Sequence, residues 1–158
     1  WSSDVCSSDL IIDAIIFDFV GESYKRGVEL LFLKPETPVE SLFIDPGKIR
    51  FVIQNLIENA IKYSDQGDRI ILSLKNTNDT LEVMVKDTGI GIPEEDKSHI
   101  FEKFFRSHKA KEKESIGTGL GLYTSKMIVE RHGGKMWFES TEGQGTTFHL
   151  ELPRKSNI

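Results

Sequence analysis

The sequence lacks an apolar run long enough to cross a membrane. A membrane span needs roughly 18 apolar residues, and the nearest candidate, Leu10 to Val20, is interrupted by Asp13 and Asp18. An excess of basic residues is missing as well, because 20 lysines and arginines stand against 25 aspartates and glutamates, for a net charge of -5. This balance argues against general binding to nucleic acid or to anionic membranes. It does not exclude a small anionic ligand, which a few local donors can bind.

Cysteine is almost absent, and its one occurrence carries no redox information. Cys6 lies in residues 1–10, WSSDVCSSDL, which read like neither a signal peptide nor a tag. Residues 4–10 resemble the translated end of a common sequencing adapter. We therefore expect residues 1–10 to be a non-native artefact of gene assembly and the native preceding segment to be missing. A natural serine-rich linker is the alternative.

The remaining residues suffice for one domain with a hydrophobic core. The chain of 158 residues is 38% hydrophobic and 28% charged, which is typical of a globular protein. Apolar periodicity and turn residues predict helices over 10–20, 46–63, part of 94–105 and 120–131, and strands over 28–33, 41–44, 69–75, 81–86, 135–140 and 146–152. These elements predict an α+β fold, a two-layer α/β sandwich in which helices cover one face of a mixed sheet. We expect the domain to span residues 11–154, with 155–158 as a tail.

The helix predicted over 46–63 carries a row of polar side chains beside its apolar stripe. Asn55, Asn59 and Lys62 are four and three residues apart, so they lie on one face of the helix. An amide oxygen is a suitable ligand for Mg²⁺, and a lysine ammonium is a point charge for phosphate. The row therefore fits a metal and phosphate site. The alternative is a solvated helix face on which Glu58 pairs with Lys62.

A loop with two glycines, Asp87-Thr-Gly-Ile-Gly91, follows directly after a predicted strand. A carboxylate at this position can accept a hydrogen bond from an amino group, which adenine presents at its 6-position, where guanine presents an acceptor. Asp87 would therefore select ATP over GTP. Gly89 and Gly91 would let the backbone approach a flat base closely. The alternative is an ordinary Asp-Gly turn.

A second glycine-rich loop, Gly117-Thr-Gly-Leu-Gly121, precedes a predicted helix. Backbone N–H groups and the positive end of the helix dipole form a phosphate site in such a loop. The loop is not a Walker motif, because no Gly-Lys-Ser/Thr follows. It is not a Rossmann fingerprint either, because no hydrophobic strand directly precedes it. A flexible lead-in to the helix is the alternative.

Taken together and in this order, five segments resemble the catalytic domain of bacterial sensor histidine kinases, in the superfamily that also holds DNA gyrase, Hsp90 and the mismatch-repair protein MutL. The segments are similar to that family's N box, first glycine box, F box, second glycine box and closing G-x-G-T-x-F element. They are Asn55–Tyr63, Asp87–Gly91, Ile100–Arg106, Gly117–Leu122 and Gly143–Phe148. The resemblance covers nearly all of the chain after residue 10.

The resemblance implies a Bergerat-type fold with ATP and Mg²⁺ as cofactors. It implies that Asn59, with Asn55 beside it, ligates Mg²⁺, and that Lys62 and Arg106 contact phosphates. It also implies nucleotide contacts from the following residues: Tyr63, Asp87, Gly89, Gly91, Ile92, Gly117, Thr118, Gly119, Leu120, Gly121 and Thr146. Residues 94–118 would form a lid, whose charged stretch Ser107–Ser115 has too few apolar residues to be held down without ligand and is expected to be mobile.

One position favours a kinase over an ATP hydrolase. Hydrolysing relatives carry a water-activating glutamate four residues before the metal-binding asparagine, where this chain has Asn55. An amide cannot act as that general base, and Glu58 lies about a hundred degrees around the helix from Asn59. We therefore expect transfer to a protein side chain. The alternatives are a degenerate nucleotide-binding module and an ATP-hydrolysing relative of the same fold.

In the family that the chain resembles, the phosphoryl group goes to a histidine on a separate helical hairpin. None of the four histidines, His99, His108, His132 and His149, lies in the family's acceptor motif. The resemblance thus implies two partners, the domain's own dimerisation hairpin and a response regulator receiver domain, with no nucleic-acid or membrane contact by this domain. It implies the cytoplasmic domain of a membrane-bound sensor in two-component signalling, with negligible self-phosphorylation by this fragment.

Overall fold

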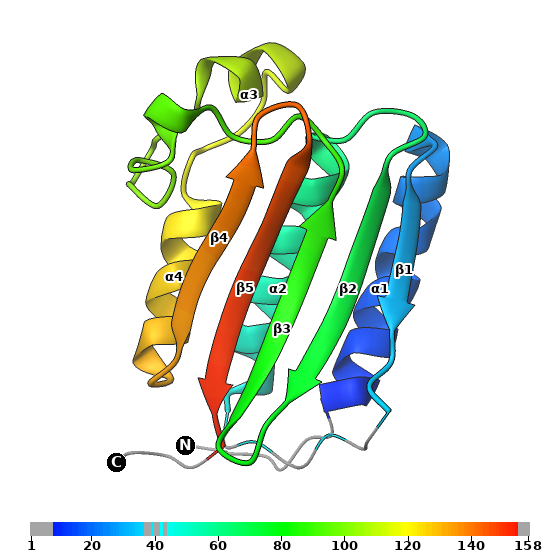
Figure 1. The fold of residues 1–158 in the computed structure, drawn as a ribbon, viewed down its shortest axis with the longest axis vertical. Coiled ribbons are helices and arrows are strands. Elements are labelled where there is room, and N and C mark those ends of the chain that lie inside the picture. The colour runs from blue at the N-terminus through cyan, green and yellow to red at the C-terminus, as the bar shows by residue number, and fades with distance from the viewer. Residues whose placement is uncertain (1–7, 37–38, 40–41, 43, 155–158) are drawn as a thin grey trace.

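The described part of the chain begins with a helix and ends with a hairpin of two strands (Figure 1). A computed structural model describes residues 8–36, 39, 42 and 44–154. The helices are α1 (Ser8–Arg26), α2 (Pro46–Lys62), α3 (His108–Lys113) and α4 (Gly121–Arg131), with a short 3₁₀ helix, η1 (Glu94–Asp96). The strands are β1 (Glu29–Leu33), β2 (Arg69–Asn76), β3 (Thr80–Asp87), β4 (Lys135–Thr141) and β5 (Gly145–Pro153).

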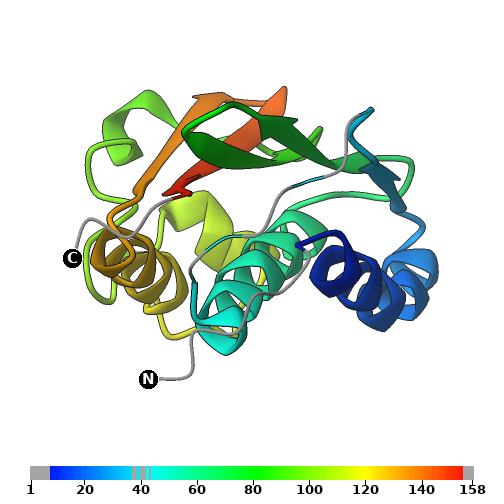
Figure 2. The same cartoon turned by 90° about the horizontal axis from the view of Figure 1, so that it is seen from below.

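The strands form one mixed sheet in the order β1-β2-β3-β5-β4. Strands β1 and β2 are parallel, which their connection through α2 allows, and the other neighbours are antiparallel. Helices α1, α2 and α4 form a second layer on one face of the sheet (Figure 2). The predicted two-layer α/β sandwich is therefore confirmed.

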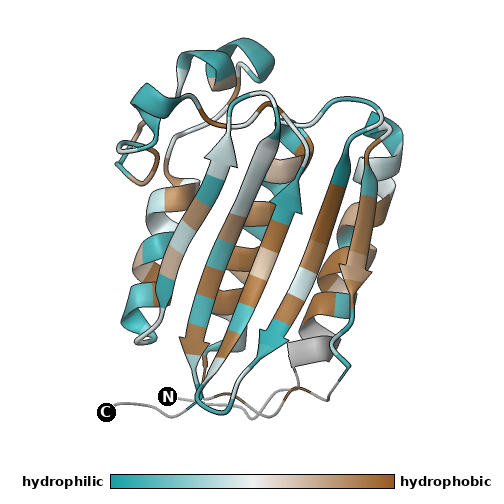
Figure 3. Ribbon diagram, viewed as in Figure 1, coloured by the Kyte–Doolittle hydropathy of each residue, from teal (hydrophilic) through white to brown (hydrophobic). Residues whose placement is uncertain are grey.

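The hydrophobic core lies between the sheet and the helices. Every second residue of β2 and β3 is buried, and Figure 3 shows the corresponding apolar bands across the sheet. The inward side chains pack with a buried stripe on α2, made of Ile49, Val52, Ile53, Leu56, Ile57, Ala60 and Ile61. This stripe fixes the rotation of α2 about its axis, and therefore fixes where its polar side chains point.

Helix α2 begins as predicted. The Oδ1 atom of Asp45 accepts a hydrogen bond from the backbone N–H of Lys48 at 3.1 Å, and Pro46 occupies the first turn. This cap lowers the pKa of Asp45, because the N–H donor stabilises the carboxylate. The backbone N–H of Asp45 donates to His132 Nε2 at 3.2 Å, which ties the start of α2 to the end of α4.

Some local predictions differ from the structure. Helix α1 runs beyond the predicted residues 10–20 and ends before Gly27, which takes the positive φ of 68° typical of a helix stop. Residues 41 and 43 of the strand predicted over 41–44 lie outside the described residues, as do residues 1–7 of the proposed artefact and the tail 155–158. A helix was not predicted at α3. None of the described helices combines the length and the hydrophobicity that a membrane crossing requires.

Candidate functional site

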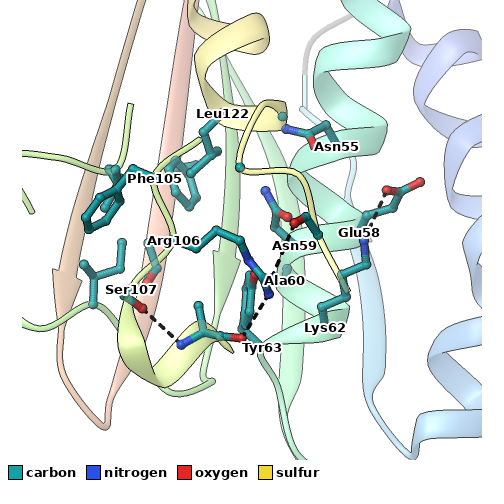
Figure 4. A pocket seen from close by; sticks show the side chains of 18 of the residues that line it. Asn55, Glu58, Asn59, Ala60, Lys62, Tyr63, Phe105, Arg106, Ser107 and Leu122 are labelled. Carbon is teal, nitrogen blue, oxygen red and sulfur yellow. Dashed lines mark hydrogen bonds and ion pairs between the residues drawn. The ribbon is translucent and has the colours of Figure 1, made fainter. Parts of the chain in front are cut away.

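A cavity of about 460 Å³ opens at one end of the sheet, where β3 ends beside α2 and the start of α4. The loops after β3, before α3 and before α4 complete its wall (Figure 4). All but one of the predicted site residues line it: Asn55, Asn59, Lys62, Tyr63, Asp87, Gly91, Ile92, Arg106, Gly117, Thr118, Gly119, Leu120, Gly121 and Thr146. The exception is Gly89, whose backbone N–H donates to the Asp87 carboxylate.

The polar row predicted on α2 reaches the cavity, with Asn55 and Asn59 turned toward it (Figure 4). The Nδ2 atom of Asn55 donates to Ser125 Oγ of α4 at 3.0 Å, and Ser125 is fully buried. Asn55 is therefore held in place rather than solvated, which leaves its Oδ1 as the possible ligand atom. The ammonium of Lys62 lies 3.8 Å from the Glu58 carboxylate. This partly exposed pair contributes little, so it does not withhold Lys62 from an anionic ligand.

The carboxylate of Asp87 lies buried at the floor of the cavity, with 7% of the residue exposed. Its Oδ1 accepts hydrogen bonds from the backbone N–H groups of Gly89 at 2.9 Å and Thr146 at 3.2 Å. Burial raises the pKa of Asp87 to about 6, against the opposing effect of these two donors, and the nearby Asp68 adds to the rise. Because Oδ1 is held by the backbone, Oδ2 is the oxygen that remains for a ligand.

The first glycine loop packs too closely for side chains at its glycines. A Cβ at Gly89 would lie 3.0 Å from the carbonyl carbon of Tyr63, and one at Gly91, whose φ is +65°, would lie 2.8 Å from that of Thr141. The backbone N–H of Ile90 donates to the carbonyl of Tyr63 at 3.1 Å. The loop is thus fixed between the end of α2 and the β4–β5 turn, and it forms a rigid floor for the cavity.

The second glycine loop also requires its glycines. A Cβ at Gly119, whose φ is +70°, would lie 2.6 Å from the carbonyl carbon of Phe104, and one at Gly121 would lie 3.0 Å from Cγ of Asn55. Helix α4 begins at Gly121, and its N-cap, Leu120, has no side-chain oxygen for the first N–H groups. These N–H groups and the helix dipole therefore offer an anion site at the cavity.

Comparison with known protein families gives a match over most of the chain. Residues 44–156, more than half of the chain, match the family described as Histidine kinase-, DNA gyrase B-, and HSP90-like ATPase. The chain belongs to this ATPase family. The resemblance to the catalytic domains of sensor histidine kinases is confirmed by individual relatives and by solved structures.

Two curated relatives illustrate the match. Sensor histidine kinase WalK of Bacillus subtilis (strain 168) is 39% identical over 159 residues, which cover 98% of this chain and 25% of WalK. Signal transduction histidine-protein kinase BarA of Escherichia coli (strain K12) is 36% identical over 154 residues, which cover 93% of this chain and 17% of BarA. The chain therefore spans a quarter or less of the length of these relatives.

Solved structures agree in fold over the whole domain. The catalytic domain of histidine kinase ThkA, in a nucleotide-free form, superposes with a TM-score of 0.81 at 29% identity, covering 94% of this chain and 95% of that one. The mycobacterial sensor histidine kinase MprB gives 0.79 at 26% identity, covering 98% and 99%. ThkA in complex with the response regulator protein TrrA gives 0.79 at 25% identity, covering 97% and 42%.

In this histidine kinase catalytic domain, α3 occupies the charged stretch that was predicted to be mobile. None of its residues is buried, which agrees with the absence of an apolar face. Polar contacts hold it instead. Ser107 Oγ caps its first turn, the Lys113 ammonium lies 2.5 Å from the Asp65 carboxylate, and Lys109 pairs with Glu142. The acidic partners of the two lysines come from distant parts of the chain, so the local sequence did not reveal the helix.

The guanidinium of Arg106 is engaged by the backbone of the lid. It donates to the carbonyls of Ala110 at 3.3 Å, Ser115 at 3.2 Å and Gly117 at 3.5 Å, and to that of Glu114. Two of these carbonyls belong to the C-terminal end of α3, so Arg106 caps that helix. A phosphate at this position would therefore compete with lid carbonyls for the same guanidinium.

Replacing Arg106 with alanine is expected to loosen α3 in the ligand-free protein. The helix loses the donor for its last carbonyls, so its amide hydrogens should exchange about tenfold faster, while those of β2 and β3 stay unchanged. Arg50→Ala is the matched control, because Arg50 pairs with Asp18 at 2.6 Å and takes no part in the lid. Equal exchange of α3 in the two variants would show that Arg106 does not hold the lid.

The apolar part of the wall was not identifiable from the sequence. Besides Glu58 and Ser107, the unpredicted lining residues are Phe51, Ala60, Ile90, Ile100, Phe105, Ala110, Ile116, Leu122, Thr124 and Phe148. Such side chains look like ordinary core residues. The five motifs include Ala60, Ile90, Ile100, Phe105, Leu122 and Phe148, but the resemblance assigned none of them a contact with the ligand. Ser125 gave no signal, because its partner Asn55 is 70 residues away.

The four histidines lie away from the cavity lining. His132 Nε2 accepts the backbone N–H of Asp45, and His132 Nδ1 lies 2.7 Å from the carbonyl oxygen of Ile128. One ring nitrogen thus accepts while the other faces an acceptor. His149 stacks on Trp137, with ring centroids 4.9 Å apart. The other two are surface residues of the lid, so none is placed to accept a phosphoryl group from this cavity.

Proposed function

We propose that this domain binds Mg-ATP and transfers its γ-phosphoryl group to a histidine on a separate dimerisation hairpin. The observation that carries this proposal is the Asp87 carboxylate, which has one oxygen held by two backbone N–H groups and the other left for a ligand. A buried acceptor at the floor of the cavity favours a base with a 6-amino group. A base with a 6-oxo group would place two acceptors against each other, which is costly in a buried site.

The other end of the cavity fits a triphosphate. Lys62 and Arg106 supply positive charge, and the start of α4 supplies backbone N–H groups. The glycines of the second loop pack closely against Phe104 and Asn55, which holds the loop beside the start of α4. This half of the cavity therefore complements the charge of the phosphates.

The residues present also fit Mg²⁺ bound together with the nucleotide. Within the described residues, no group of three or more His, Cys, Asp or Glu side chains could hold a metal alone. The ion would instead rest on the amide oxygens of Asn59 and Asn55, on phosphate oxygens and on water. When bound, Mg²⁺ neutralises charge on the phosphates during transfer.

The contribution of this chain to the reaction is positioning and charge stabilisation. Lys62 and Arg106 would hold the γ-phosphate in line with the attacking nitrogen, which the hairpin histidine supplies. Asn55 cannot take a proton from water. Glu58 points toward Lys62 rather than toward Asn59, which supports transfer over hydrolysis (Figure 4).

The proposed reaction requires two protein partners. The first is the dimerisation hairpin that carries the acceptor histidine, and the second is a response regulator receiver domain that receives the phosphoryl group. The complex of the relative ThkA with its response regulator supports the second partner. The names of WalK and BarA, a sensor histidine kinase and a signal transduction histidine-protein kinase, support a role in signalling. We propose further that this domain is the cytoplasmic part of a membrane-bound sensor.

Calorimetric titration with a non-hydrolysable ATP analogue and Mg²⁺ tests the binding half of this proposal. We expect saturable binding of the ATP analogue, and binding of the matching GTP analogue at least about 100-fold weaker. Incubation with radiolabelled ATP and a purified acceptor hairpin should then label the hairpin and leave the domain unlabelled. No binding at millimolar analogue would contradict the proposal. Binding without transfer would leave a degenerate nucleotide-binding module.

A further inference from the structure

A single hydroxyl group joins the two loops at the adenine end of the cavity. Ser140 Oγ, on β4, donates to the carbonyl of Gly145 at 3.0 Å and accepts the backbone N–H of Ile92 at 2.9 Å. It also lies 2.8 Å from the hydroxyl oxygen of Thr146. Ser140 itself does not line the cavity, whereas Ile92 and Thr146 do.

Proton accounting fixes the direction of the bond between Ser140 and Thr146. A serine hydroxyl has one proton and two lone pairs. The proton of Ser140 goes to the carbonyl of Gly145, which can only accept, and one lone pair takes the N–H of Ile92. In the remaining contact Ser140 must therefore accept, so the Thr146 hydroxyl is the donor. The lone pairs of Thr146 are then the part of its hydroxyl available to a ligand.

The same contacts reach Asp87. The backbone N–H of Thr146 donates to Asp87 Oδ1 at 3.2 Å, and a Cβ at the preceding Gly145 would lie 2.8 Å from the carbonyl carbon of Asp87. The bonds of Ser140 to Gly145 and Thr146 thus fix the strand end against which Asp87 rests. Asp87 Oδ2 and Thr146 Oγ1 are both acceptors at this end of the cavity, and a 6-amino group has two protons to offer.

We propose that Ser140 is a positioning residue for base recognition, which holds the Thr146 hydroxyl as an acceptor so that Thr146 and Asp87 together select a purine with a 6-amino group. This inference rests on the proposed nucleotide binding. Without Ser140, the Thr146 hydroxyl is free to rotate and can donate to a 6-oxo group. Discrimination against 6-oxo purines therefore depends both on the Asp87 carboxylate and on the direction in which the Thr146 hydroxyl donates its proton.

The test compares ATP with inosine triphosphate, which carries a 6-oxo group on the same scaffold. Binding of both is measured by calorimetry, with Mg²⁺, for the wild type and for Ser140→Ala, Ser140→Thr and Ser73→Ala. Ser73 lies on β2, between Leu33 and Met84 in the sheet register, and serves as a matched loss of a strand hydroxyl. Thermal unfolding of each variant is followed so that binding is compared between folded proteins.

We expect Ser140→Ala to reduce the preference for ATP over inosine triphosphate by about tenfold. Ser140→Thr keeps the hydroxyl and should restore the preference, and Ser73→Ala should match the wild type. If Ser140→Ala weakens the binding of both nucleotides equally, or of neither, Ser140 has no role in selection. A merely structural role leaves the ratio of the two affinities unchanged. A wild type that binds neither nucleotide would instead refute the proposed function, and this inference with it.

Discussion

Asp87→Asn is expected to weaken binding of an ATP analogue by about 100-fold, because it replaces the acceptor that faces the 6-amino group. The amide oxygen can still accept the N–H groups of Gly89 and Thr146, which now hold Oδ1. The amide nitrogen then takes the place of Oδ2 and presents a donor to the adenine amino group. The same variant should bind a 6-oxo nucleotide more tightly than the wild type does. Calorimetry with both nucleotides measures this change in preference.

The same substitution should stabilise the ligand-free protein. The pKa of Asp87 is raised from 3.8 to about 6 by burial, so holding the charged form at pH 7 costs up to about 3 kcal/mol. An asparagine carries no such cost. Urea denaturation at pH 7 should therefore show a higher midpoint for Asp87→Asn than for the wild type, although the variant binds the ATP analogue more weakly. This opposition of stability and binding distinguishes a ligand-binding carboxylate from a structural one.

The pH dependence of the wild type is the control for both effects. Because the folded pKa lies above the unfolded one, the folded protein binds the proton more tightly. The contribution of Asp87 to stability is fully present below pH 3.8 and is lost as the pH rises through about 6. ATP affinity runs the other way and should fall as the pH drops below about 6, because the protonated group presents a donor. An affinity that is flat between pH 5 and 8 would contradict this assignment.

Gly145→Ala is expected to cause the largest loss of stability, more than about 3 kcal/mol. Gly145 has a φ of +108°, and a Cβ there would lie 2.8 Å from both the carbonyl carbon of Asp87 and Cα of Thr88. These backbone atoms at the end of β3 cannot move away from Gly145 without separating β3 from β5. Urea denaturation of the purified variant measures the loss.

Gly143 provides the matched control within the same turn. It also has a positive φ, +75°, but a Cβ there would have nothing within 4 Å. Gly143→Ala should therefore cost only the backbone strain of about 1 kcal/mol. If the two variants unfold at the same urea concentration, the close approach of Gly145 to Asp87 does not contribute to stability.

The elements that repeat a short pattern were predictable from the sequence. Apolar residues at helical spacing after an Asp-Pro start predicted helix α2. Strict alternation of apolar and polar residues predicted the hairpin of β2 and β3. The five motifs, taken together and in order, identified nearly all of the site residues, although no single motif was sufficient. These signals are local in sequence, or depend on the resemblance to a family.

The features that escaped prediction depend on contacts between distant residues. Asn55 and Ser125 are 70 residues apart, and Ile92 and Ser140 are 48 apart. Nothing in the neighbourhood of either serine marks it as a partner. The same holds for α3, whose stability comes from ion pairs with other elements rather than from an apolar face. Side-chain geometry after folding, and not composition, decides these contacts.

Helix α3 covers the nucleotide cavity without sharing in the hydrophobic core, since none of its residues is buried. Substitutions on its outer surface therefore leave the packing of the domain intact, whereas substitutions around Asp87 do not. Inhibitors that anchor on the floor of the cavity will meet side chains that the packing of the domain holds in place. Compounds that extend beneath α3 will meet a helix that the hydrophobic core does not constrain. We therefore expect selectivity between related kinases, and escape from an inhibitor by mutation, to depend on residues of that helix.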